Sequence, residues 1–286
     1  MQDMLEKVSL YGGTGFIGGT YNKMFNEKSL LIPRSQKKPI TNNILYFIST
    51  IHNYNIFENP HLDIETNLSL LISVLEKCRD KENIVFNFVS SWFVYGKTED
   101  LPANENSTCN PKGFYSITKR AAEQLLISYC ETFNIKYRIL RLCNVYGKAD
   151  NKVSKKRNAL QYLINEIIEN RDIELYDAGN NIRDLMHVED VCKAINLVVE
   201  QGPINDVINI GSGKPHKFID MMEYVKDKTN SKSAFRSVDP PRFHKIVQVK
   251  DMYLDVTKLK NLGFEPKYDI KDGLDLIIKD LREKNE

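Results

Sequence analysis

The chain has 286 residues, 42% of them hydrophobic and 27% charged, which is enough apolar material for one large domain or two modest ones. Its 40 basic and 38 acidic residues nearly balance, so nothing indicates binding to nucleic acid or to an anionic membrane. The five cysteines are scattered without a C-x-x-C pair, which argues against a disulfide framework or a zinc site and favours reduced thiols in the cytoplasm.

The N-terminal stretch MQDMLEKVSL has no basic region followed by a long apolar run, so we expect neither a signal peptide nor a membrane span. Beyond it, apolar runs typical of strands alternate with segments of helical periodicity, the pattern of a parallel sheet flanked by helices. Strands are predicted at 7–11, 29–33, 44–49, 84–90, 136–142 and 206–211, and helices at 17–27, 65–80, 115–133 and 188–202. The last third is more polar and irregular, which indicates a smaller cap domain.

The connection between the second and third predicted strands is unusually short. Only the ten residues RSQKKPITNN, at 34–43, separate them. A complete nucleotide-binding half would place another helix and strand there. We therefore predict a sheet that is shortened after its second strand.

A glycine-rich turn follows the first strand, in the stretch SLYGGTGFIGG. Gly12, Gly15 and Gly18 form G-x-x-G-x-x-G between a predicted strand and a predicted helix, the context that favours a dinucleotide site over a plain tight turn. Glycine lets a pyrophosphate lie against the main chain, and the helix start, with Phe16 and Ile17, offers free N–H groups.

The second strand lacks the acidic residue that usually holds the ribose hydroxyls of NAD. It ends LLIPRS, so that Arg34 and Ser35 follow it. An arginine there suits a 2′-phosphate, which favours NADP(H) while NAD stays possible. The alternative is a solvent-exposed arginine beside a turn.

A catalytic group is predicted from two later stretches. VSSWFVYG ends a buried strand with Ser91, and GFYSITKRAAEQ opens a helix with Tyr115 and Lys119 on one face. A neighbouring cation stabilises the phenolate, which can accept a hydroxyl proton as hydride leaves, while Ser91 holds the same oxygen. Tyr115 and Lys119 are also expected to bind the cofactor. A surface tyrosine–lysine pair is the plain alternative, and the order of the three motifs argues against it.

This combination resembles the extended short-chain dehydrogenase/reductases, the NAD(P)-dependent nucleotide-sugar epimerase/dehydratase family. GGTGFIGG is similar to the family's cofactor turn, SSWFVYG and YSITK to its catalytic segments, and TNLSLLISVLEKC, with Asn67, to its asparagine-bearing helix. Four later blocks follow in the family's order: RLCNVYG, NIRDLMHVEDV, NIGSG and LDVTKLKNLGFEP.

The resemblance implies a Rossmann-like doubly wound α/β sheet with a small α/β substrate-binding domain. Residues 1–147 plus 182–211 would bind the dinucleotide, and residues 148–181 plus 212–286 the nucleotide-sugar. The implied substrate residues are Asn144, Asn158, Tyr176, Arg183 and Arg242, with the arginines at the nucleotide-sugar and its diphosphate. A homodimer through a four-helix bundle is expected as well. His187 lies in a motif block and is interpreted as structural.

The chain also departs from the family pattern. Trp92 and Phe93 stand where the 4,6-dehydratases place Asp-Glu, so dehydration is disfavoured, and Trp92 replaces the cysteine of the fucose-synthase-like enzymes. The shortened segment removes the usual aspartate at the adenine, whose binding would rest on residues such as Ile40 and the FISTIH turn.

These features predict redox at C4 of the sugar of a nucleotide-diphosphate-sugar. A 4-epimerase and a 4-ketoreductase both fit, and the sequence leaves the choice between them open. The alternative is a dinucleotide-binding sensor without catalysis, which would have no need to keep all three catalytic residues. Balanced charge speaks against an RNA-binding relative.

Overall fold

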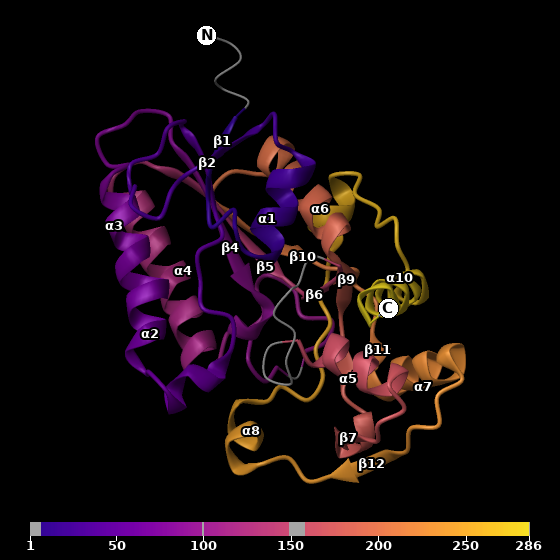
Figure 1. Cartoon of the computed structure of the whole chain (residues 1–286). Coiled ribbons are helices and arrows are strands. Elements are labelled where there is room, and N and C mark those ends of the chain that lie inside the picture. The colour runs from indigo at the N-terminus through magenta and orange to yellow at the C-terminus, as the bar shows by residue number, and fades with distance from the viewer. Residues whose placement is uncertain (1–6, 99, 149–157, 286) are drawn as a thin grey trace.

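The computed structural model describes residues 7–98, 100–148 and 158–285. Within them, six parallel strands form one sheet in the order β2-β1-β3-β4-β5-β10 (Figure 1). The strands are β1 (Val8–Tyr11), β2 (Ser29–Leu31), β3 (Asn43–Tyr46), β4 (Val85–Ser91), β5 (Lys136–Leu142) and β10 (Asp206–Ile210). The predicted doubly wound α/β sheet is confirmed, and each strand falls within or one residue beside its expected range.

Helices cover both faces of the sheet, which explains why its strands are nearly continuous apolar runs. On one face α1 (Phe16–Met24) packs against α6 (Val188–Gln201). On the other lie α4 (Phe114–Thr132) and a bent helical segment. That segment consists of α2 (His61–Ile64), the π-helical turn η3 (Glu65–Ser69) and α3 (Leu70–Glu76). Successive side chains along a strand point to opposite faces of the sheet. Leu10 and its neighbour Tyr11 therefore belong to different hydrophobic clusters, one on each face.

The expected shortening of the sheet is also confirmed. Residues 32–42 contain no helix or strand, and β2 forms the edge of the sheet. The short connection is tied to the first strand, because the Ser9 hydroxyl accepts hydrogen bonds from the main-chain N–H groups of Ile40 (2.9 Å) and Thr41 (2.8 Å).

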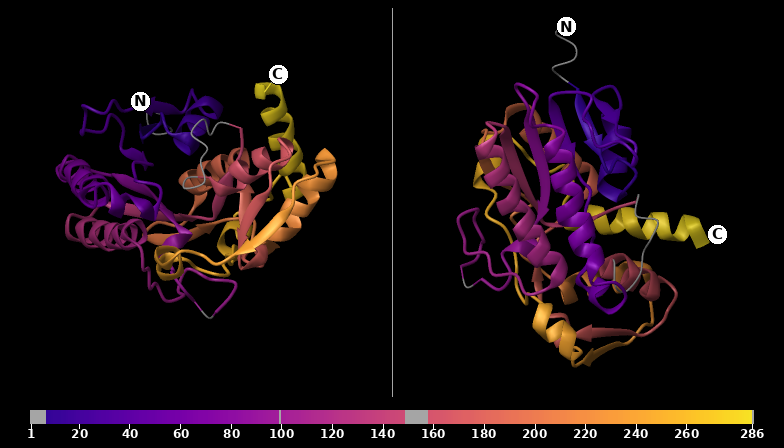
Figure 2. Two further views of the ribbon diagram at one scale, coloured as in Figure 1. Left: turned by 60° about the horizontal axis from the view of Figure 1, so that its bottom comes forward. Right: turned by 90° about the vertical axis from the view of Figure 1, so that its left-hand side faces the viewer.

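A third hydrophobic cluster forms the lower part of the molecule in Figure 1, and Figure 2 shows α10 along its outer side. It packs α5 (Ala159–Ile168), α7 (Phe218–Thr229) and α10 (Ile270–Asn285) together. Three two-stranded sheets adjoin it: β6 (Asn144–Tyr146) with β9 (Leu185–His187), β7 (Ile173–Tyr176) with β12 (Phe235–Val238), and β8 (Ile182–Arg183) with β11 (His216–Lys217). The remaining elements are η2 (Asn53–Phe57), η4 (Trp92–Val94), η5 (Asp177–Gly179), α8 (Arg242–Val247) and α9 (Thr257–Asn261).

All five cysteines lie in the described part of the chain and are free thiols. Among the helices of that part, none has both the length and the apolar character needed to cross a membrane.

Candidate active site

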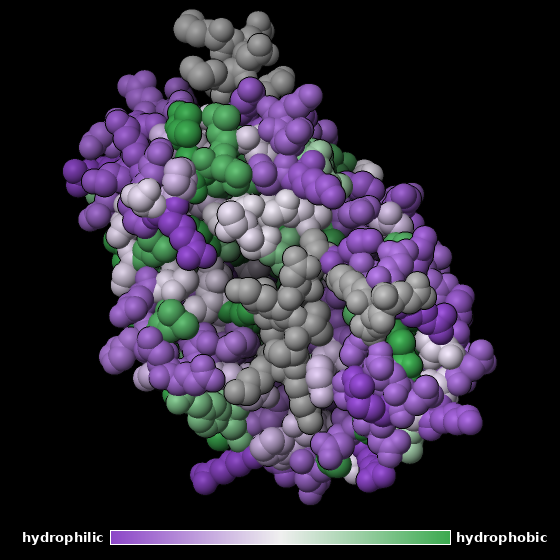
Figure 3. Space-filling view, viewed as in Figure 1, coloured by the Kyte–Doolittle hydropathy of each residue, from purple (hydrophilic) through white to green (hydrophobic). Residues whose placement is uncertain are grey.

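A cavity of about 860 Å³ lies at the carboxyl ends of the central strands. It begins at the glycine turn after β1, passes the end of β4 and the start of α4, and reaches α5, η5 and α8. Figure 3 shows a mainly hydrophilic face that is hollowed near its centre. Ligands of open parallel sheets bind at this edge, so the cavity lies where the fold class predicts a site.

Glycine is suited to positions 12, 15 and 18 of the turn for different physical reasons. Gly12 has a φ of +80°, a conformation that side chains disfavour. At Gly18 an added Cβ would lie 2.4 Å from the carbonyl oxygen of Gly12. Gly15 has an ordinary φ of −78°, and an added Cβ would meet nothing closer than 3.5 Å. Neither strain nor packing requires a glycine at position 15; glycine is a favoured N-cap residue, and its bare backbone also leaves room for a ligand to approach closely.

The helix that follows the turn begins without a side-chain cap. Gly15 is the N-cap residue of α1, and Phe16 and Ile17 of its first turn line the cavity. The first N–H groups of a helix and the positive end of its dipole attract phosphate. The residues present therefore fit the pyrophosphate of a dinucleotide, in agreement with the sequence prediction.

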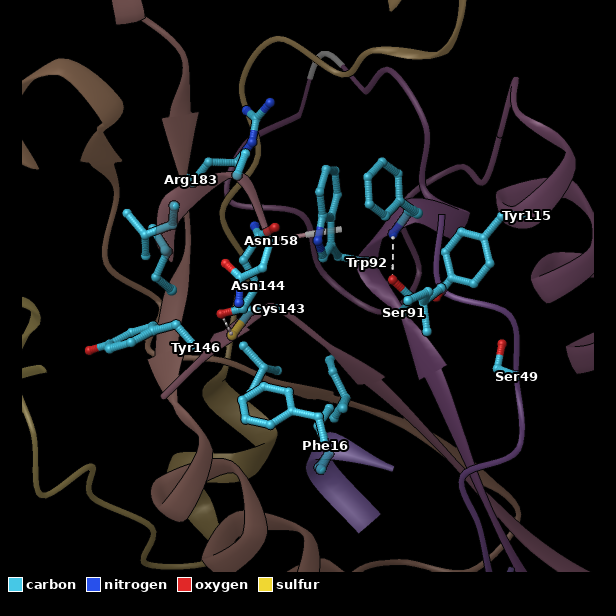
Figure 4. Close-up of a pocket in the computed structure, with 18 of the residues that line it drawn as sticks. Phe16, Ser49, Ser91, Trp92, Tyr115, Cys143, Asn144, Tyr146, Asn158 and Arg183 are labelled. Atoms are coloured by element: carbon cyan, nitrogen blue, oxygen red, sulfur yellow. Dashed lines mark hydrogen bonds between the residues drawn. The ribbon is translucent and has the colours of Figure 1, made fainter. Parts of the chain in front are cut away.

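Ser91, Tyr115 and Lys119 all line this same cavity. Ser91 is the last residue of β4, and Tyr115 lies in the first turn of α4 with Lys119 one turn later. Figure 4 shows Ser91 and Ser49 beside the Tyr115 ring, and both side chains act to lower the pKa of Tyr115. The three predicted residues thus come together from two separate elements.

Burial is the main cause of the shifted pKa values of Tyr115 and Lys119. It raises the pKa of Tyr115, and the contact with Ser91 acts in the opposite direction. Lys119 is only 2% exposed, and its Nζ donates to the carbonyl oxygen of Val89 at 2.7 Å. Burial lowers the pKa of Lys119 to about 7, against the opposing charge of Glu123. The positive charge expected of Lys119 beside Tyr115 is therefore sensitive to pH near neutrality.

Two stacked aromatic side chains, Trp92 and Phe93, lie beside Tyr115. The Trp92 and Phe93 rings stack with centroids 3.9 Å apart, and Phe93 meets the Tyr115 ring edge-on at 6.0 Å. Both rings line the cavity. The positions where the dehydratases place two carboxylates are thus apolar contact surface.

Arg183 lines this cavity as a cation that forms no ion pair with the described residues, although the charge of Asp251 acts on it. Its guanidinium donates to the main-chain oxygens of Ile182 (2.7 Å), Lys250 (2.5 Å) and Val249 (2.8 Å), and it lies 5.6 Å from the Trp92 ring centroid. Burial lowers its pKa to about 10, so it stays protonated at neutral pH. No carboxylate of the described residues forms an ion pair with it, which favours an anionic ligand at this point.

The other predicted substrate residues are near Arg183, with one exception. Asn144, Asn158 and Tyr176 line the cavity, and Figure 4 shows the two asparagines and Arg183 across from Ser91 and Tyr115. Asn144 Nδ2 donates to the carbonyl oxygen of Asp184 at 3.1 Å, and Asn158 is the N-cap of α5. Arg242 is exposed at the start of α8 and is not among the residues that line the cavity.

Comparison with known proteins bears on the identity of this site. Residues 44–211 match the NAD dependent epimerase/dehydratase family. The chain belongs to this family. A Methanocaldococcus jannaschii protein with the provisional name UDP-glucose 4-epimerase is 30% identical over 244 residues, which cover 85% of this chain and 77% of the relative.

Two solved structures share the fold of this epimerase/dehydratase family member. The UDP-glucose 4-epimerase of Thermotoga maritima, in complex with UDP-glucose, matches with a TM-score of 0.87 and 23% identity over 98% of this chain and 100% of that one. RMD from Pseudomonas aeruginosa, in complex with NADPH, matches with a TM-score of 0.85 and 19% identity over 98% and 99%.

Some predicted cofactor residues of this family member lie outside the cavity. Arg34 and Ser35 are exposed in the turn after β2, and their contact with a 2′-phosphate stays a prediction. Ile40, suggested for the adenine, is also exposed, whereas Ile51 of the FISTIH turn lines the cavity. His187 is 4% exposed and accepts a hydrogen bond from Glu189 N at 3.4 Å, which fits the structural interpretation.

Two cavity residues of this family member had no local sequence signal, and a third, Ser49, lies in the FISTIH turn that was expected only at the adenine. Ser49 follows β3, Tyr54 lies in η2, and His244 lies in α8. The Tyr54 hydroxyl and His244 Nδ1 are 3.3 Å apart although 190 positions separate them in the chain. Only the fold brings such residues together, so no spacing could have shown them.

Proposed function

We propose that this protein carries out NAD(P)-dependent redox at C4 of the sugar of a nucleotide-diphosphate-sugar, as a 4-epimerase or a 4-ketoreductase. The observation that carries the proposal is a single cavity that joins the glycine turn, the Ser91–Tyr115–Lys119 group and Arg183. A dinucleotide fits one end of it, and a diphosphate-linked sugar fits the other.

The chemistry follows from the residues around Tyr115. Ser91 orients the sugar hydroxyl, and the Tyr115 phenolate accepts its proton when that carbon is oxidised. In the opposite direction the phenol returns a proton to a ketone. A bound nicotinamide supplies or accepts the hydride. Trp92 and Phe93 exclude solvent from this side of the site. Neither residue offers a carboxylate that could remove water from the sugar, which supports simple redox over dehydration.

The cofactor would be held along the turn and the first strands. The proposed contacts are Gly12, Gly15, Phe16, Ile17 and Gly18 at the pyrophosphate, Tyr115 and Lys119 at the nicotinamide ribose, and Arg34 and Ser35 at a 2′-phosphate. NADP(H) is favoured on the strength of Arg34, and an arginine side chain is long enough to turn towards a ligand from an exposed position.

Replacing Arg34 by alanine is expected to weaken NADPH about ten-fold while leaving NADH affinity unchanged, because only NADPH carries the phosphate that a charged hydrogen bond would hold. Fluorescence titration with both cofactors measures this. Lys38→Ala removes another exposed cation from the same segment and serves as the control for general charge effects. Equal losses for both cofactors in Arg34→Ala would show that Arg34 does not read the 2′-phosphate.

The substrate would occupy the cleft between two domains, 1–147 plus 182–211 and 148–181 plus 212–286. Asn144, Asn158, Tyr176 and Arg183 are its proposed contacts, with Arg242 at the diphosphate from α8. The separate hydrophobic cluster of α5, α7 and α10 supports this division.

A panel of nucleotide-sugars and their 4-keto forms, incubated with each cofactor, tests the function. A 4-epimerase converts one sugar into its C4 epimer without net cofactor consumption, and a 4-ketoreductase oxidises one NADPH per product. Product analysis and nicotinamide absorbance separate the two. Tight cofactor binding without hydride exchange for any sugar would favour the sensor instead.

We also propose a homodimer in the cytoplasm. Five apolar side chains on α2, α3 and α4 are exposed by 36–46%: Leu62, Ile64, Ile72, Ile117 and Leu125. Sedimentation is expected to give twice the chain mass of 33.1 kDa, and Leu125→Glu should shift it to one chain. A wild-type mass of one chain contradicts the dimer.

A further inference from the structure

A buried polar network lies directly behind Tyr115. Its centre is Asn67, which is 2% exposed and sits in the π-helical turn η3. Asn67 Oδ1 accepts from Ser49 Oγ (3.0 Å) and from Thr50 N (2.9 Å). Asn67 Nδ2 donates to Thr50 Oγ1 (2.8 Å) and to Thr118 Oγ1 of α4 (2.9 Å). Every hydrogen-bonding position of the amide is used, so Asn67 locks the turn after β3 to the helix that carries Tyr115.

The network ends at a buried carboxylate. Asp63 is fully buried in α2, and its Oδ1 accepts from the Thr50 hydroxyl and from Asn55 Nδ2 (3.0 Å). Its Oδ2 has no hydrogen-bond partner in the described part of the chain. The negative charge of Asp63 contributes to the raised pKa of Tyr115, after burial and against the hydrogen bond of Ser91.

Ser49 is the point where this network reaches the reacting atom. It lines the cavity, lies beside the Tyr115 ring in Figure 4, and acts to lower the pKa of Tyr115. Asn67 holds Ser49 in this position through the bond to its hydroxyl. Lys119 Nζ meanwhile donates to Val89.

We propose that Ser49 is a further catalytic residue, whose hydroxyl contacts the Tyr115 oxygen opposite Ser91 and stabilises it as the phenolate. The inference rests on the proposed role of Tyr115 as the proton carrier. While Tyr115 is a phenol, Ser49 accepts its hydrogen bond and donates to Asn67. When Tyr115 loses its proton, the Ser49 hydroxyl turns to donate to the phenolate, and no covalent bond changes at Ser49.

Two substitutions should move the titration of Tyr115 in opposite directions. Ser49→Ala removes a donor to the phenolate and is expected to raise the measured pKa by about half a unit or more. Asp63→Asn removes a like charge at nearly constant shape and is expected to lower it. Asp63 is the charged group that acts on Tyr115 by raising its pKa, and both variants leave Lys119 in place. A general loosening of the site would not produce shifts of opposite sign.

The titration is followed by ¹⁹F NMR of protein that contains 3,5-difluorotyrosine, whose more acidic phenol titrates in an accessible range. Tyr115→Phe assigns the signal. Ser73→Ala is the matched control, because the Ser73 hydroxyl donates to the Ser69 carbonyl one turn earlier and to no other described residue. An unchanged Tyr115 titration in Ser49→Ala would overturn the proposal.

Turnover provides a second, independent measurement. Ser49→Ala is expected to lower kcat about ten-fold with little change in KM, and to move the pH optimum of turnover to higher pH. Ser49→Thr keeps the hydroxyl and is expected to retain most of the wild-type kcat. The NMR titration needs no sugar. A shifted titration in a protein that turns over none of the sugars would therefore support the role of Ser49 and count against the proposed function, so the two failures are distinguishable.

Discussion

Replacing Tyr115 by phenylalanine is expected to lower turnover by at least about a hundred-fold, because it removes the group that carries the proton. The substitution keeps the ring, its burial and its edge-on contact with Phe93 at 6.0 Å. Steady-state kinetics with a substrate from the panel measures the loss. NADPH affinity should remain near the wild-type value, since the glycine turn and the helix start are untouched.

Tyr129→Phe on the same helix is the matched control for the Tyr115 variant. Tyr129 lies more than three turns further along α4, where its ring packs against Phe133 at 4.6 Å, away from the cavity. The same loss of a hydroxyl should leave turnover unchanged there. If Tyr115→Phe also retained wild-type turnover, the assignment of the catalytic group would be wrong.

Replacing Arg183 by methionine is expected to raise the KM for a nucleotide-sugar by about ten- to a hundred-fold. This is the loss of affinity expected when one charged hydrogen bond to the substrate is removed. The physical reason is that Arg183 is a half-buried cation whose hydrogen bonds within the described residues go to main-chain oxygens. A diphosphate would supply the missing negative charge. Arg183→Lys should recover part of the affinity, since lysine restores the charge without the planar fork.

Two further measurements separate this effect from damage to the fold. The Arg183 guanidinium also ties residues 249 and 250 to β8, so thermal unfolding and NADPH affinity are measured beside KM. Arg236→Met, at an exposed arginine paired with Asp172, is the control for loss of an arginine elsewhere. An unchanged KM in Arg183→Met, with an unchanged melting temperature, would contradict a diphosphate at this position.

Much of the fold could be predicted because its signals are local. The strand β5 begins and ends where its apolar run does, and α4 differs by one residue at each end from its periodic segment. The shortened sheet followed from the length of one connection. That Ser91, Tyr115 and Lys119 line one cavity was also predictable, because Ser91 closes a strand while Tyr115 and Lys119 are one helical turn apart. Parallel strands expose their carboxyl ends at a common edge.

The sequence by itself therefore determined the sheet, the glycine turn and the candidate catalytic triad, since each depends on neighbours within one or two elements. Only the tertiary structure decided that Ser49 and Asp63 approach Tyr115, that Tyr54 meets His244, and that Arg34 and Arg242 stay exposed. It also decided the titration of Lys119, because burial beside Phe88 lowers a pKa that residue spacing cannot reveal. Such contacts, and the burial that shifts a pKa, depend on the three-dimensional positions of residues that are far apart in the sequence, so they are set only when the chain folds.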